Sequence, residues 1–166
     1  MRWFACGSLV LLFGIAIQLR AAGPDVLVGH WKLTKSILDG KETPTQEELE
    51  ITFAAQRVFI RDISHNRLRQ KERKYRLDGK PSQNEMFEGK KFSRWQNDTL
   101  VAETHFTLGF GTSTIMETWS VLPDGTLQNL FQGHNLPICK GCDPQNPPKT
   151  FTLSDLRIQA TYIRVR

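Results

Sequence analysis

The chain has 166 residues and a formal net charge of +5, which falls to +3 without the two arginines of its first 22 residues. That length suits one domain with its own hydrophobic core. The charge surplus is too small for the concentrated positive field of a dedicated nucleic-acid-binding protein, so no nucleic-acid partner is expected.

The first 22 residues have the three parts of a secretory leader. Arg2 supplies positive charge, residues 8–17 form a short apolar run, and Ala21-Ala22 supplies small residues suited to cleavage. We therefore expect residues 1–22 to be a signal peptide, residues 23–166 to be a single domain, and the protein to be secreted or periplasmic. An uncleaved anchor is the alternative, because the uncharged stretch 3–19 approaches the length that spans a bilayer. No membrane span is expected after cleavage.

Apolar and polar residues alternate along most of the chain from Val26 onward, as in β-strands with one buried face. Turn sequences such as Asp39-Gly40 and Asn97-Asp98 separate these runs. The pattern predicts about nine strands, at 28–36, 48–53, 57–63, 67–77, 86–95, 99–107, 113–122, 126–132 and 156–166. Short connections favour an all-β antiparallel up-and-down meander. Such a meander removes its exposed edges by closing into a β-barrel, here of about 8–10 strands.

Two segments of this chain are ambiguous. Residues Thr45 to Glu48, after Pro44, match a helix capping box, and a short helix here would plug one end of the barrel. A polar loop is the alternative. Seven basic residues lie between Arg67 and Lys80, which favours a solvated hairpin projecting beyond the barrel. A basic lip that attracts anionic ligands or cell-envelope polymers is the alternative for this segment.

The first expected strand contains Gly29-His30-Trp31, which resembles the Gly-x-Trp signature of the lipocalins and the wider calycin group. The chain also resembles small secreted bacterial proteins described as lipocalin-like, through segments 29–33, 94–95, 98–104 and 117–120. The resemblance implies a lipocalin-like barrel in which Trp31 closes the floor and an arginine of a late strand packs over it. Arg164 is the matching arginine, and Arg166 is the second candidate. The resemblance implies almost no function, because such barrels serve as carriers, enzymes and inhibitors.

Three charged residues, Arg94, Glu103 and Glu117, lie on three consecutive expected strands. If Asn97-Asp98 is a two-residue turn, Arg94 and Glu103 are diagonal neighbours on one face. The register of the next hairpin places Glu117 either opposite Glu103 or beside Ala102 on the other face. The group is therefore a candidate buried contact for a polar ligand. An acid–base pair and a structural ion-pair network are the alternatives.

Cys139 and Cys142 are the cysteines that remain after the leader, and they lie in a Pro- and Asn-rich segment expected to be a loop from 133 to 149. In an oxidising compartment we expect a small disulfide that stiffens this loop. A metal site that adds His134 is an alternative, although it lacks a fourth ligand. A redox-active cysteine pair is a further alternative.

These features together predict a secreted or periplasmic lipocalin-like protein that binds a small, partly apolar ligand inside its barrel. We expect a monomer with no catalytic residue, metal or cofactor. The expected ligand-binding residues are Arg94, Glu103, Glu117, Trp95, Trp119 and Trp31. One alternative is a module for protein–protein or surface interaction in the cell envelope. Another is a barrel-mouth isomerase or hydrolase that uses a glutamate as acid or base.

Overall fold

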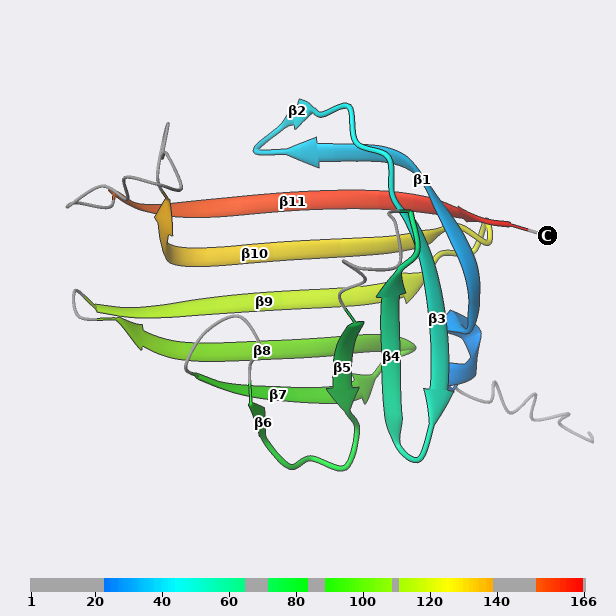
Figure 1. The fold of residues 1–166 in the computed structure, drawn as a ribbon, viewed down its shortest axis with the longest axis horizontal. Coiled ribbons are helices and arrows are strands. Elements are labelled where there is room, and N and C mark those ends of the chain that lie inside the picture. Colours follow the sequence, from blue (N-terminus) through cyan, green and yellow to red (C-terminus); the bar gives the residue numbers. More distant parts are fainter. Residues whose placement is uncertain (1–22, 65–71, 84–88, 109–110, 139–151, 166) are drawn as a thin grey trace, which may run out of the picture.

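The computed structural model describes residues 23–64, 72–83, 89–108, 111–138 and 152–165, and their regular secondary structure is β-strand apart from one turn of 3-10 helix (Figure 1). The predicted leader, residues 1–22, lies outside the described residues. Within the described ranges, none of the helical structure has the length and hydropathy of a membrane span. The elements are η1 (Pro24–Leu27), β1 (Gly29–Leu38), β2 (Lys41–Glu42), β3 (Glu48–Ala54), β4 (Arg57–Asp62), β5 (Glu72–Arg76), β6 (Ser82–Gln83), β7 (Gly89–Gln96), β8 (Thr99–Leu108), β9 (Gly111–Val121), β10 (Leu127–Ile138) and β11 (Thr152–Arg164).

The strands form one antiparallel sheet that nearly closes into a barrel. Their order is β5-β4-β3-β1-β11-β10-β9-β8-β7-β6, with β2 paired to β1. Because β1 lies between β3 and β11, the first long strand pairs with the last one. The remaining opening lies between β5 and β7, where the Ser93 hydroxyl donates a hydrogen bond to the Arg76 carbonyl at 2.8 Å. The predicted all-β meander barrel is therefore confirmed, and the nine predicted strands all have counterparts.

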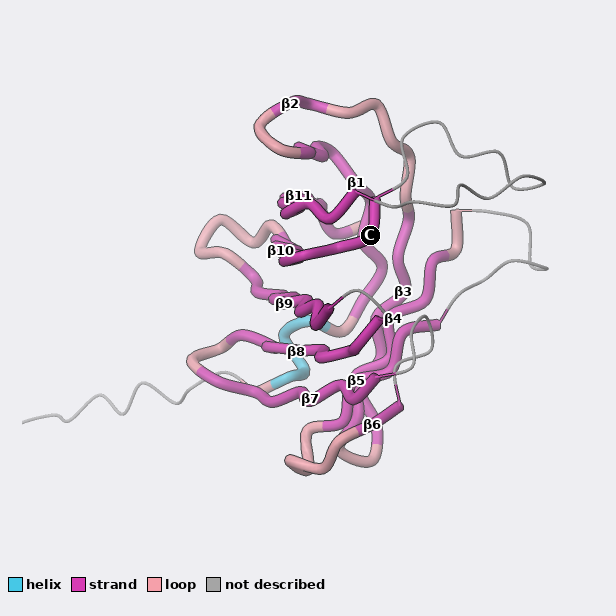
Figure 2. The backbone as a smooth tube through the Cα atoms, turned by 90° about the vertical axis from the view of Figure 1, so that its left-hand side faces the viewer, coloured by secondary structure: helices cyan, strands magenta, loops and turns pink. Residues whose placement is uncertain are grey.

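The sheet is folded over so that its two halves face each other. Strands β3, β4 and β5 cross in front of one end of β7 to β11 at a steep angle (Figure 1), and the side view separates the two layers (Figure 2). Strand β1 bends between the layers, pairing with β3 through residues 29–32 and with β11 along its length. A register shift between Leu33 and Lys35 provides the irregularity at which such a strand can bend.

Turn chemistry explains the tight hairpins. Asn97 and Asp98 have φ values of 49° and 56°, as a two-residue type I′ turn requires, and both residue types tolerate this conformation. The turn sets the register that the sequence predicts, with Trp95 opposite Leu100. Ala55-Gln56 makes the corresponding turn between β3 and β4 with φ values of 48° and 59°, although neither residue type signals it.

Alternation along the strands fills the barrel with apolar side chains. A second, smaller cluster of Phe106, Ile115 and Leu136 lies further along β8, β9 and β10, with Phe131 and Leu156 packed against it. The main buried cluster consists of Leu27, Trp31, Leu49, Ile51, Val58, Ile60, Tyr75, Leu100, Ala102, Trp119, Leu127, Ala160 and Tyr162.

Trp31 is fully buried at the end of the barrel that η1 covers. Its indole N–H donates a hydrogen bond to the Leu27 carbonyl at 2.8 Å. The Arg164 guanidinium lies 4.5 Å from the ring centroid and donates to the Val26 carbonyl at 2.9 Å. Gly29 has φ of 148°, a conformation that side chains rarely adopt, so a glycine is required beside this pair. The predicted packing of Arg164 over a buried Trp31 is confirmed; Arg166 lies outside the described residues.

Residues 43–47 form the loop that was the alternative to a short helix, and the Leu33 N–H donates to the Glu47 carbonyl, which holds this segment beside β1. Two local predictions need correction. Strand β5 belongs to the sheet instead of projecting from it, since Tyr75 is buried opposite Val58. The expected loop at 133–149 starts later, because β10 continues to Ile138 past a register irregularity.

Trp31→Ala is expected to lower the free energy of unfolding by about 3–5 kcal/mol, because it removes a large buried aromatic and the surface on which Arg164 packs. Denaturant unfolding followed by circular dichroism measures the change. Phe92→Ala is the matched control, since Phe92 lies on the outer face of β7 with 39% exposure and its loss should cost less than about 1 kcal/mol. Equal losses for the two variants would contradict the role assigned to Trp31.

Candidate ligand-binding site

A partly open cavity of about 440 Å³ lies on the inner side of the sheet. Side chains from β1, β5, β9, β10 and β11 line it, together with the segment that joins β2 to β3. Exposed Leu38 and Thr45 are on its rim, whereas Ala160 and Tyr162 are buried at its wall. The lining residues are Leu33, Ser36, Leu38, Thr43, Thr45, Glu47, Arg73, Glu117, Asn129, Phe131, Ile158, Ala160 and Tyr162. The walls are thus mostly apolar, with charged groups gathered at one place.

Glu117 is the centre of this charged group. Its carboxylate accepts hydrogen bonds from Tyr75 Oη at 2.7 Å, Trp119 Nε1 at 3.0 Å and Arg73 Nη1 at 3.3 Å. The Arg73 guanidinium also lies 5.0 Å from the centroid of the Trp119 ring. A buried carboxylate is stable only when paired and hydrogen-bonded, and these donors meet that requirement.

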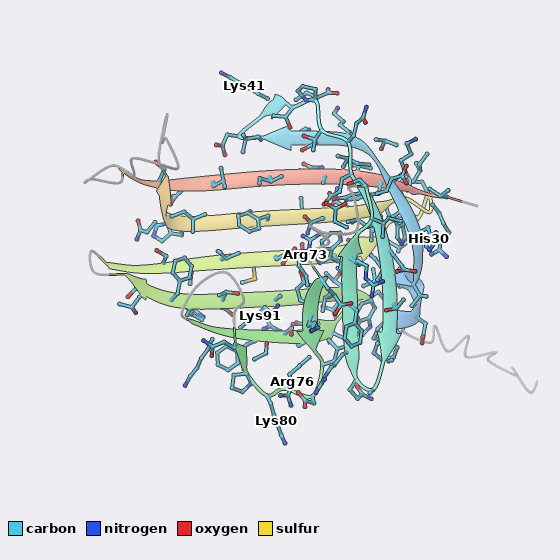
Figure 3. The ribbon with its side chains drawn as sticks, viewed as in Figure 1. His30, Lys41, Arg73, Arg76, Lys80 and Lys91 are labelled. Atoms are coloured by element: carbon cyan, nitrogen blue, oxygen red, sulfur yellow. The ribbon has the colours of Figure 1, made fainter. Side chains whose placement is uncertain are left out.

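Glu47 is the second carboxylate of the cavity. Its Oε2 accepts a hydrogen bond from Tyr162 Oη at 2.7 Å, and its Oε1 lies 3.8 Å from Arg73 Nη2. Arg73 therefore lies between two carboxylates, reaching from β5 toward the long strands, whereas Lys41 and Lys80 point away from the barrel (Figure 3). The described residues of the lining include one cationic side chain and two anionic ones.

Both tyrosines of the chain take part in this network. Burial, reinforced by the Glu117 charge and by the hydrogen bond to it, raises the pKa of Tyr75 well above its ordinary value of 10.0. Burial also raises the pKa of Tyr162, and the Glu47 carboxylate adds to the effect. The two phenols therefore remain protonated donors, which keeps each carboxylate anchored on one side.

The structure does not bring the three charged residues predicted from the sequence together. Arg94 and Glu103 share the outer face, where Arg94 Nε donates to Gln96 Oε1 at 2.9 Å and Glu103 pairs with His105 at 2.8 Å. Glu117 pairs with Ala102 in the ladder and points inward, as the second predicted register has it. Arg94 and Glu103 are thus separated by the sheet from the cavity that Glu117 lines.

The three tryptophans take different positions. Trp119 is buried and contributes its N–H to the charged group, and its ring lies 6.0 Å from that of Tyr162. Trp31 is buried next to η1, and Trp95 packs against the main cluster from the inner face of β7. None of these tryptophans is among the residues that line the cavity, although Trp119 lies directly beneath Arg73.

Four residues of the charged group were not predicted from the sequence: Glu47, Arg73, Tyr75 and Tyr162. The alternation in Arg73-Lys74-Tyr75 was an available signal, because it places Arg73 and Tyr75 on one face. The many basic residues around them obscured it.

Glu103 lines a different hollow, of about 480 Å³. The hollow lies on the outer face of the sheet, where Glu103, Met116, Gln132 and Arg157 are paired in one row across four neighbouring strands. His134 at its edge pairs with Asp155 at 2.7 Å. Cys139 and Cys142, and with them the predicted disulfide and its alternatives, lie outside the described residues. Within the part of the chain that the structure describes, no group of three histidine, cysteine or acidic side chains is placed to hold a metal ion.

The topology defines a nearly closed antiparallel β-barrel. No family model and no curated protein matches the sequence. Among solved structures, the fold is similar to that of apo lipid binding protein 8 of Caenorhabditis elegans, with a TM-score of 0.60 over 86% of this chain and 98% of that chain. The sequence identity is 10%, so the similarity concerns the fold alone.

Native protein is expected to form no tyrosinate near pH 10, because both phenols are buried donors to carboxylates. Ultraviolet absorbance during an alkaline titration measures this directly, since the chain has only two tyrosines. The denaturant-unfolded chain is the control and should titrate near pH 10. Reversible tyrosinate formation near pH 10 in protein that stays folded would contradict the network.

The same shifts predict how stability depends on pH. The folded-state pKa values lie above the unfolded value of about 10, so the contribution of the phenols is fully present below that pH and is lost as the pH rises above it. The denaturant concentration at the midpoint of unfolding should therefore decrease as the pH is raised from about 9 to about 11. Tyr75→Phe should weaken that dependence, because the substituted side chain cannot ionise.

Proposed function

We propose that this protein is a secreted or periplasmic binding protein that holds a small, partly apolar ligand in the interior of its barrel. The observation that carries the proposal is the cavity of about 440 Å³, whose apolar walls end at the charged group of Glu47, Arg73 and Glu117. Its volume is within the range of sites for small molecules, and a mostly apolar lining with a few polar groups is typical of them.

Two further features support the proposal. The barrel resembles that of a protein named for lipid binding, in a form without ligand. Export is supported by the leader-like residues 1–22.

The role of Glu117 is better explained by ligand positioning than by acid–base chemistry, because three donors already occupy its carboxylate. Arg94 and Glu103, which lie on the outer face, are not part of the proposed interior site.

Ala160→Leu should weaken ligand binding at least tenfold while leaving the protein folded. Ala160 lies in the cavity wall, between Ser36 on β1 and Asn129 on β10, so a larger side chain there occupies the space of the ligand. Binding is measured by tryptophan fluorescence against fatty acids, aromatic acids and isoprenoids, and by native mass spectrometry of the exported protein for a copurifying ligand.

Gln159→Leu is the matched control, because Gln159 precedes Ala160 on the same strand and, by alternation, faces outward. It should bind as the unmodified protein does. If no compound gives a response and no ligand copurifies, the binding proposal is overturned and an envelope interaction module becomes the better explanation. Equal weakening by both variants would also contradict an interior site.

A further inference from the structure

Among the residues that the structure describes, the cavity lining has an excess of negative charge. Glu47 and Glu117 face a single cation, Arg73, and the guanidinium is closer to Glu117, at 3.3 Å, than to Glu47, at 3.8 Å. Lys91 is the next cation on the inner face, and its Nζ lies 4.4 Å from the ring of Tyr75 rather than in the lining. The charge that remains is therefore concentrated at Glu47.

Two oxygens in the lining have unused capacity to accept hydrogen bonds. Glu47 Oε1 has Arg73 at ion-pair distance, and no donor among the described residues is within hydrogen-bond distance of it. Asn129 is 6% exposed; its Nδ2 donates to the Thr118 carbonyl at 3.1 Å, and its Oδ1 accepts no bond from the described residues. No buried side-chain oxygen of the described residues lacks a partner, so these two oxygens are accessible, and a ligand that supplies a donor can hydrogen-bond to them.

Resting on the proposed function, we propose that the ligand carries a hydrogen-bond-donating head group, an ammonium in preference to a hydroxyl, and that the cavity discriminates against carboxylates. The head group lies against Glu47 and the apolar body against Phe131, Ile158 and Leu33. An ammonium meets the uncompensated carboxylate and offers three donors. A carboxylate head would add a third anion around one guanidinium that already has two partners.

A matched series of n-octylamine, n-octanol and n-octanoate tests this proposal, because the three compounds share an apolar chain and differ at the head. Isothermal titration calorimetry at neutral pH, below the concentrations at which these compounds aggregate, gives the affinities. The expected order is amine, then alcohol, then carboxylate, with at least tenfold between the first and the last.

Glu47→Gln assigns the effect to its residue. The amide oxygen still accepts from Tyr162 Oη, so the fold is retained, while the excess negative charge is removed. The variant should bind octylamine about tenfold more weakly, bind octanoate more tightly and bind octanol unchanged. Glu50→Gln is the control, because Glu50 is on the outer side of β3, where it pairs with Arg61 at 3.4 Å, and it should leave all three affinities unchanged.

The outcomes separate the two proposals. Octanoate binding as tightly as octanol or octylamine would overturn the head-group proposal and leave interior binding intact. Affinities for octylamine and octanoate that are unchanged in Glu47→Gln would also overturn it. Two results together would overturn both proposals. None of the three compounds would bind, and Ala160→Leu and the unmodified protein would have the same affinity for every other compound tested.

Discussion

The Glu117 carboxylate is the contact on which the closed form of the barrel depends. Among the described residues, strand β5 forms a ladder with β4 alone, and its other edge meets β7 without regular pairing. Arg73 and Tyr75 reach from β5 across the interior to Glu117 on β9, so a charged network holds the two layers where the backbone ladder is interrupted. Removing one partner of such a buried network leaves the others desolvated and unpaired, which is why its integrity matters more than any single bond in it.

The same network explains why the barrel has a cavity instead of a continuous core. On β9, Glu117 lies between Trp119 of the main apolar cluster and Ile115 of the smaller one. Hydrated or hydrogen-bonded charges cannot be covered by close-packed aliphatic side chains without a large cost, so the two clusters remain separate. The space between the network, β1 and β11 is then available to a ligand that satisfies the remaining acceptors.

A shared barrel does not determine what is bound. The similarity to a lipid-binding protein extends over most of this chain at 10% identity, so the backbone arrangement is retained while nearly all side chains differ. Two carboxylates surround one guanidinium inside this barrel, and under the proposed function these charges set the choice of ligand. The outer hollow around Glu103 has a different character, since its ion pairs are exposed and screened by solvent.

The sequence by itself determined the strands and the meander, because alternation with period two and turn residues such as Asn97-Asp98 are local signals. The packing of Arg164 over Trp31 was implied by the resemblance of Gly29-His30-Trp31 to the lipocalin signature. The sequence also predicted that Arg94 and Glu103 share a face. Only the tertiary structure decided which side of the sheet that face is on, and that Glu47, Arg73 and Glu117 meet. Glu47 comes from a loop before β3, Arg73 from β5 and Glu117 from β9. Their meeting depends on the curvature and closure of the whole sheet, which no local pattern encodes.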